Sequence, residues 1–205
     1  MSSDYPVQID VTSPPHFDRV QLLLRIGIAI LLGWLGLTAG WLVCLLFGAL
    51  PLIAAIAISA ERDAYHQEVA PQVWSVLDWL LRLSAYMLLL VDRFPTDETR
   101  SVVIDIRYTG QPTVGSALVR LITSIPSGLV LMLLWCVSSV VWIVAALAVL
   151  FGLSMPRSIL AFQRGVLRWQ ARLVAYHASF VAEYPPWSFD TETPSGAALA
   201  MAGGR

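Results

Sequence analysis

The sequence predicts a mainly α-helical membrane protein made of two tandem repeats, and three observations predict this fold class. First, the 205 residues are 57% hydrophobic and 13% charged, whereas about a quarter of the residues in a soluble domain are charged. Second, residues 22–60 and 117–155 form two apolar runs of 39 residues, each with one charged residue, Arg25 and Arg120. Third, each run stands between the same two kinds of segment, which indicates an internal repeat.

A short alternating segment precedes each apolar run. Residues 5–11 (YPVQIDV) alternate apolar and polar side chains, which is typical of a half-buried β-strand. Residues 102–106 (VVIDI) repeat this pattern, and Asp105 follows Asp10 by 95 positions. We therefore expect two equivalent strands that pair in one small sheet, because neither would be stable alone. Asp10 and Asp105 are expected at outward positions of this sheet and not at a catalytic site.

Each apolar run is too long to be one straight membrane-spanning helix. A helix of 39 residues would extend about 58 Å, roughly twice the hydrocarbon thickness of a bilayer. One interpretation is a transmembrane hairpin of two short helices, with tips at 36–40 and 136–139. The alternative is a single kinked span in each repeat, which in the second repeat covers 127–152 after a bend at Pro126. The hairpin keeps the equivalent strands on one side of the membrane.

The segment after each apolar run carries a Trp, an Arg and a Tyr at relative positions 1, 4 and 8, and the second set follows the first by 90 positions. These spacings place the three side chains on one side of a helix. Trp and Tyr favour the bilayer interface, and Arg can reach lipid phosphates. We therefore expect an interfacial amphipathic helix in each repeat. The residues predicted to contact lipid or a partner are Trp79, Arg82, Tyr86, Arg164, Arg168, Trp169, Arg172 and Tyr176.

The repeats extend over residues 5–96 and 101–190, and the small residues of 191–205 predict a disordered tail. Arg25 and Arg120 each stand fourth in an apolar run, so we expect their side chains to snorkel to the bilayer surface. Neither run contains Asp, Glu or His, whereas the ion and proton pathways of transporters usually use such residues. This composition argues against a transporter or a channel.

The arginines predict where the protein is located. Several of them follow the second apolar run, and an excess of Lys and Arg marks the cytoplasmic side of a membrane protein. The sequence contains no Lys and no Asn, whose codons are A/T-rich, and this indicates a GC-rich bacterial genome. We therefore expect a multi-pass protein of the bacterial inner (cytoplasmic) membrane with its polar regions mostly in the cytoplasm.

Few side chains are arranged to support catalysis or to bind a cofactor. His16, His66 and His177 are not spaced as metal ligands with another His, Cys or carboxylate. Cys44 and Cys136 lie within the apolar runs, where burial in apolar surroundings makes a thiol inert. The formal net charge of −1 argues against nucleic-acid binding. We therefore expect no enzymatic activity, no cofactor, no metal and no nucleic-acid partner.

The end of the second repeat resembles a known family. The motifs are Pro156-Arg157, then Arg168-Trp169 with Arg172, then Ala175-Tyr176, and finally residues 184–188 (YPPWS). They resemble the motifs of bacterial membrane proteins of domain-of-unknown-function family 4389, and the resemblance covers most of the second repeat. The first repeat is a weaker copy, because the double Pro and the Ser are missing after Phe94. The resemblance implies a membrane protein with two tandem copies and implies no mechanism.

A structural role is the function that fits these observations best. We expect an accessory or scaffolding subunit of a larger bacterial membrane complex, in contact with membrane lipids and with protein partners. The alternative is a lipid-binding or lipid-handling module, in which the hairpins and the interfacial helices form an amphipathic groove. Purification in mild detergent separates the two, because a subunit retains a stoichiometric protein partner and a lipid module is a monomer with bound lipid.

Overall fold

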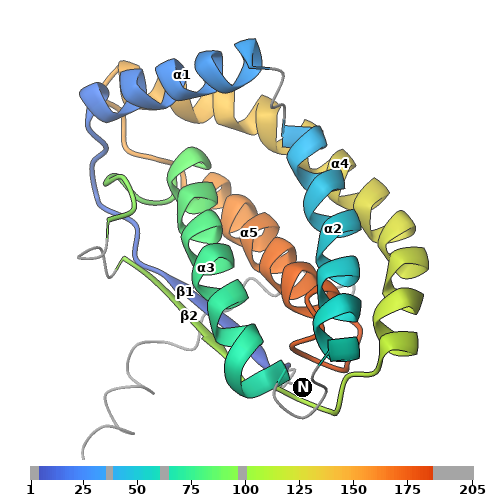
Figure 1. The fold of residues 1–205 in the computed structure, drawn as a ribbon. Coiled ribbons are helices and arrows are strands. Elements are labelled where there is room, and N and C mark those ends of the chain that lie inside the picture. Colours follow the sequence, from blue (N-terminus) through green and yellow to red (C-terminus); the bar gives the residue numbers. More distant parts are fainter. Residues whose placement is uncertain (1–4, 36–38, 61–64, 97–100, 187–205) are drawn as a thin grey trace, which may run out of the picture.

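The structure of the chain, a computed structural model, describes residues 5–35, 39–60, 65–96 and 101–186 (Figure 1). The side chains of residues 39–46 and 124 lie outside the description, and so does the tail at 191–205, for which disorder stays a prediction. The elements in chain order are β1 Val7–Val11, α1 Arg19–Trp34, α2 Ala39–Ala60, η1 Tyr65–Val69, α3 Ala70–Met87, β2 Val102–Ile106, α4 Val114–Leu150 and α5 Arg157–His177.

The helices form two groups on one side of a two-stranded sheet (Figure 1). α3 and α5 lie next to the sheet, where α3 contacts β2 and α5 contacts β1. α1, α2 and α4 form an outer layer, in which the long, curved α4 packs against both α1 and α2. The protein is therefore mainly helical with one small sheet, as the sequence predicts.

The two strands pair in an antiparallel sheet, which confirms the pairing predicted from their sequence likeness. The paired residues are Val7–Ile106, Gln8–Asp105, Ile9–Ile104, Asp10–Val103 and Val11–Val102. β1 alternates between buried apolar and exposed polar side chains, so its apolar face packs on α5. Asp10 and Asp105 are exposed on the other face, at the outward positions that were expected.

A break divides the first apolar run into two helices. α1 begins after the N-cap Asp18, whose carboxylate accepts a hydrogen bond from the backbone N–H of Val20. α1 ends at Trp34, and α2 begins at Ala39. The tip predicted at 36–40 therefore coincides with the break, although residues 36–38 themselves lie outside the described residues.

The second apolar run is one continuous helix and not a hairpin. α4 continues from Val114 to Leu150 through the tip predicted at 136–139, and it also contains Pro126. The serines of this segment fit a helix because their hydroxyls can bond to the preceding turn, as Ser139 Oγ does to the carbonyl of Trp135. The two-helix hairpin predicted for this run is therefore wrong, because the run forms one continuous helix.

α3 and α5 end with the same turn. Leu89 and Ser179, two residues after these helices, have positive φ angles of 56° and 61°. The backbone N–H of Leu90 donates to the carbonyl of Ala85, and that of Phe180 donates to the carbonyl of Ala175, both at 3.0 Å. These bonds belong to the Schellman motif, which satisfies carbonyl groups at a helix end and usually contains Gly. The equivalent residues of the two turns lie 90 positions apart.

α5 lies inside the molecule, whereas the sequence predicted an interfacial helix. Every residue from Gly165 to His177 is buried, because α2, α3, α4 and β1 all pack around this helix. The interfacial position predicted for the second helix is therefore wrong. α3 differs from α5 and keeps an exposed side, on which Trp79 is 44% exposed whereas the corresponding Trp169 of α5 is 5% exposed.

Candidate functional site

Arg25 is a fully buried charged residue that joins α1 to the end of α3. Its Nε donates to the carbonyl of Tyr86 at 2.8 Å, and its Nη2 donates to the carbonyl of Val91 at 2.6 Å. The guanidinium carbon lies 4.1 Å from the centre of the Tyr86 ring, and Nη2 lies 3.5 Å from a carboxylate oxygen of Asp92. A cation is favoured at this position because the last carbonyl groups of a helix carry partial negative charge.

Arg120 makes the corresponding contacts between α4 and the end of α5. Its Nη1 donates to the carbonyl of Tyr176 and to that of Val181, the latter at 2.9 Å. The guanidinium carbon lies 4.4 Å from the centre of the Tyr176 ring. The residue that corresponds to Asp92 is Ala182, so carbonyl oxygens and an aromatic ring take the place of the carboxylate here.

The expectation that Arg25 and Arg120 snorkel to the bilayer surface is wrong. Their exposed fractions are 0% and 5%, because each guanidinium finds its partners within the protein. The sequence contained a signal for this role. Both arginines stand fourth in an apolar run, and the Tyr whose carbonyl and ring they contact recurs as well. A charged residue that recurs together with its partner is more consistent with a shared internal contact than with lipid contact.

The groups around Arg120 are neutral. The Tyr65 hydroxyl donates to the carbonyl of Ala178, and burial raises the pKa of Tyr65 to about 12. His177 is fully buried against the ring of Phe47. Burial lowers the pKa of His177 to about 4, so the neutral imidazole donates from Nδ1 to the carbonyl of Leu173 at 2.7 Å. Neither Tyr65 nor His177 therefore titrates near neutral pH. The charge of Arg120 is surrounded by neutral groups that hold the fold together.

The eight residues predicted to contact lipid or a partner lie in different environments. Five of them are buried, namely Tyr86, Arg168, Trp169, Arg172 and Tyr176. Arg82 is partly exposed and pairs with Asp78 at 2.7 Å, and Arg164 is partly buried and donates to Ser13 Oγ at 2.9 Å. Trp79 is the member of the set with an exposed side chain. Contact of these residues with lipid or a partner stays a prediction.

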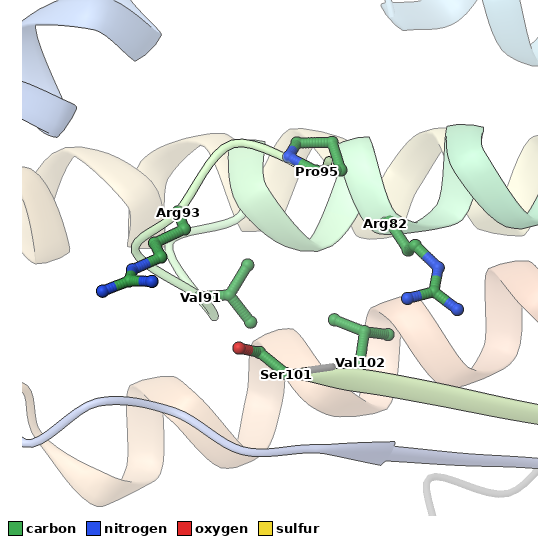
Figure 2. Close-up of a pocket in the computed structure, with 6 residues that line it drawn as sticks. All are labelled: Arg82, Val91, Arg93, Pro95, Ser101 and Val102. Carbon is green, nitrogen blue, oxygen red and sulfur yellow. The ribbon is translucent and has the colours of Figure 1, made fainter. Parts of the chain in front are cut away.

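A small hollow lies between α3 and the start of β2 (Figure 2). Its lining residues are Arg82, Val91, Arg93, Pro95, Ser101 and Val102, and it encloses about 10 Å³. This volume is roughly that of the space needed for one water molecule. Figure 2 shows the guanidinium groups of Arg82 and Arg93 pointing away from each other. The two cations therefore do not converge on one ligand.

Beyond Arg19 at the first position of α1, the described part of the outer layer of helices exposes apolar side chains and no charge. Residues 20–35, 47–60 and 114–154 contain two charged residues, Arg25 and Arg120, and both are buried. The exposed apolar side chains include Leu23, Ile30, Leu31, Ile56, Ile122, Leu133, Val140, Ile143 and Leu147. Within the described residues, one helical segment, Ile125–Leu150, is long and apolar enough to cross a membrane, and 17% of its most apolar part is buried. α4 is therefore largely exposed, unlike the core helix of a soluble protein.

The described residues do not contain a metal centre of the usual kind. Among them, no group of three or more His, Cys, Asp or Glu side chains is placed to hold a metal ion. Cys136 is a free, exposed cysteine on α4, and the side chain of Cys44 lies outside the description.

Comparison with known proteins finds one family model that matches part of the second half of the chain. Residues 115–189 match the family model Domain of unknown function (DUF4389). The DUF4389 segment includes Arg120, both carbonyl groups that Arg120 binds, and all of α5. The match supports the family resemblance of the second half, whereas a second copy in the first half and a bacterial origin stay predictions. No curated protein and no solved structure matches the chain.

Proposed function

We propose that this protein is a structural or accessory subunit of a larger bacterial membrane protein complex and that it is a multi-pass protein of the inner membrane. The observation that carries this proposal is the exposed apolar layer of α1, α2 and α4, in which Arg19 at the first position of α1 is the one exposed charge among the described residues. Monomeric soluble proteins rarely expose contiguous apolar patches larger than a few hundred Å². Lipid and a hydrophobic partner would cover such a layer.

The structural contacts of the buried polar groups support a non-catalytic role. Arg25 and Arg120 bind carbonyl groups at helix ends, and His177 bonds to the preceding helical turn. Groups used in this way hold elements together and are not directed toward a substrate. A subunit that supports other proteins needs a defined shape and a compatible surface, and it does not need a reactive centre.

We also infer that residues 5–96 and 101–190 are tandem repeats. Arg25 and Arg120 lie 95 positions apart, and the carbonyl groups that they bind lie 90 positions apart, at Tyr86 and Tyr176. The two positive-φ residues also lie 90 positions apart. Equivalent contacts at an offset of 95 in the first part of the unit and of 90 in the last part are the expected result of a duplicated unit with a length change between them.

The lipid-handling alternative shares the apolar layer but needs a groove that fits an acyl chain. The hollow beside Arg82 and Arg93 has room for about one water molecule. This hollow does not supply such a groove, and we place the accessory subunit first. Lipid that remains bound to a monomer would support the alternative.

The test is purification of the tagged full-length chain from membranes in mild detergent, followed by native mass spectrometry. The expected result is a protein partner at a constant ratio. The variant Trp79→Ala should lower this ratio, because Trp79 is an exposed member of the predicted contact set. Arg157→Ala, which changes an exposed residue at the start of α5, is the matched control. A monomer with lipid alone would contradict the subunit, and recovery from the soluble fraction would contradict a membrane location.

A further inference from the structure

We propose that both halves of the chain enter and leave the bilayer from the same side, with the outer helical layer in the hydrocarbon and the exposed face of the sheet in water. The proposal rests on the membrane location proposed above. It assigns a bilayer-facing surface to α1, α2 and α4 and orients that surface relative to the sheet. The alternative is an inverted arrangement, in which the two halves have opposite orientations across the membrane.

The first step is the symmetry of the sheet. The strand register is centred on the pair Ile9–Ile104, and these two residues lie 95 positions apart, as Arg25 and Arg120 do. The backbone N–H of Thr12 donates to the carbonyl of Ser101, and that of Arg107 donates to the carbonyl of Pro6, both at 2.9 Å. An antiparallel pair with such a register is related by a 180° rotation about an axis through its centre and perpendicular to the sheet.

The helices follow the same rotation. α1 packs against the last part of α4, where Leu22 meets Ala145 and Val149. α2 packs against α4 and lies beside its earlier part (Figure 1). The beginning of each apolar run therefore packs against the end of the other run, which Figure 1 shows as α1 and α2 beside different parts of the curved α4. The axis passes from the sheet, between α3 and α5, toward the outer layer.

The second step is the position of charge relative to this axis. Asp10 and Asp105 each lie one residue from the central pair, about 3.3 Å along a strand, and both are exposed. In an inverted arrangement the axis lies in the membrane plane, so both carboxylates would be exposed near the bilayer centre. Charged groups are strongly disfavoured there. If the axis lies along the membrane normal, the same carboxylates face water.

The third step is that both ends of α4 return to charged residues. At the beginning of α4, Thr109 Oγ1 donates to the carboxylate of Glu183 at 2.7 Å. At its end, the guanidinium of Arg19 lies beside Gly152, the second residue after α4. The middle of α4, which includes the exposed Cys136, carries no charge. Polar surroundings at both ends and an apolar middle also fit a crossing helix, but α4 is curved around the core, so that both of its ends turn toward the sheet side of the molecule (Figure 1).

The test is labelling of single cysteines with a membrane-impermeant maleimide in intact cells and in inside-out vesicles. Gln111→Cys and Ser154→Cys place probes at exposed positions before and after α4, in a chain that also carries Cys44→Ala and Cys136→Ala. Asp105→Cys in the same chain reports on the sheet. The native Cys136, tested in a chain with Cys44→Ala alone, reports on the middle of α4.

The expected result is that Gln111→Cys, Ser154→Cys and Asp105→Cys are labelled from one and the same side, and that Cys136 is labelled only after detergent is added. Labelling of Gln111→Cys and Ser154→Cys from opposite sides would overturn the same-side arrangement and leave the membrane location intact. Labelling of Cys136 in intact membranes would also overturn it. Release of the unchanged chain from membranes by alkaline carbonate would instead overturn the membrane location, which distinguishes the two proposals.

Discussion

Arg25 and Arg120 are buried charges whose main partners are backbone carbonyl groups and a tyrosine ring. A helix end presents carbonyl groups that have no partner within the helix, and a guanidinium can donate to several acceptors at once. Arg25 and Arg120 therefore link the beginning of each apolar run to the turn that ends the α3 or α5 helix. The tyrosine rings cover the guanidinium faces. This contact fixes the position of an apolar helix relative to the core.

Replacement of Arg120 by Met should destabilise the protein. The carbonyl group of Val181 would lose its donor inside the core, whereas that of Tyr176 would keep the backbone N–H of Ser179. The loss for an unpaired buried acceptor is about 1–3 kcal/mol. We expect the free energy of unfolding in detergent to decrease by about 2 kcal/mol. Arg157→Met, at an exposed position, should change it by less than about 0.5 kcal/mol. Equal losses in the two variants would show that the bonds of Arg120 contribute little.

His177 should make stability depend on pH below neutrality. The pKa of His177 in the folded protein is about 4 because of burial, and that of an unfolded histidine is about 6.5. Between these values the unfolded chain binds more protons than the folded chain. The contribution of the neutral His177 to the free energy of unfolding is therefore fully present above pH 6.5 and decreases as the pH falls toward 4. The total loss is about 3 kcal/mol.

His177→Leu tests this pH dependence, because titration of the other groups is common to both proteins. Chemical unfolding measured from pH 7 to pH 4 should show a smaller decrease in stability for His177→Leu than for the unchanged protein. Parallel curves would contradict the neutral, buried histidine. Glu183, whose pKa is lowered chiefly by its hydrogen bond from Thr109, adds a decrease at acidic pH that is the same in both proteins and therefore cancels in the difference.

At this scale the sequence predicted which residues recur but not where their side chains lie. The recurrence of Trp, Arg and Tyr is visible in the sequence, and its amphipathic spacing predicts contact with a bilayer. In α5 the same spacing directs Trp169, Arg172 and Tyr176 into the protein. Arg172, for example, lies 5.4 Å from the ring centre of Tyr5, a residue 167 positions earlier. Spacing determines which side chains share a helix side, whereas tertiary packing determines what that side contacts.

Element boundaries were predictable where a local signal existed. The β-strand pairing followed from alternation and from the likeness of two five-residue segments. The break between α1 and α2 coincides with a segment rich in Gly. No comparable signal exists at 136–139, and the hairpin expected there came from the length limit of a bilayer span. α4 avoids that limit because it curves around the core (Figure 1), a property that depends on contacts with α1 and α2 and that the sequence of α4 alone does not contain.

The turn after α5 provides a prediction at the scale of an element. Ser179 has a φ of 61°, a conformation that Gly adopts without the cost of about 1–2 kcal/mol that other residues incur. Its hydroxyl is buried and has no hydrogen-bond partner within the described residues. Ser179→Gly should therefore increase the free energy of unfolding by about 1 kcal/mol, measured by chemical unfolding in detergent.

The equivalent turn after α3 is the control for this prediction. Leu89 has nearly the same φ, but its side chain is 1% exposed and packs with Leu22, Ala145 and Val149. Leu89→Gly should destabilise the protein by about 2 kcal/mol or more, because the loss of buried surface exceeds the gain from relieved strain. Destabilisation by Ser179→Gly would show that the backbone at this turn is not strained.

The whole molecule separates apolar surface from charge. The outer helical layer has exposed apolar side chains, the interior contains arginines paired with carbonyl groups, and the sheet presents Asp10 and Asp105 on its open face. The overall composition predicted a membrane protein, but it did not predict that the apolar runs would cover one side of a small core of α3, α5 and two strands. That arrangement depends on Arg25, Arg120 and the strand register, which connect residues far apart in the chain.

A matched pair of charge insertions tests this separation of surfaces. Ile143 on α4 is 57% exposed and Val103 on β2 is 56% exposed, so an aspartate at either position has similar access to the protein surface. An aspartate in the middle of a membrane helix costs about 2.5–3.5 kcal/mol. We therefore expect Ile143→Asp to reduce the amount of protein recovered in the membrane fraction several-fold, and Val103→Asp to leave it nearly unchanged. Quantitative immunoblotting of membranes after a carbonate wash measures both variants. If both variants are recovered equally, the outer layer does not contact hydrocarbon, and its apolar side chains must instead be covered by protein.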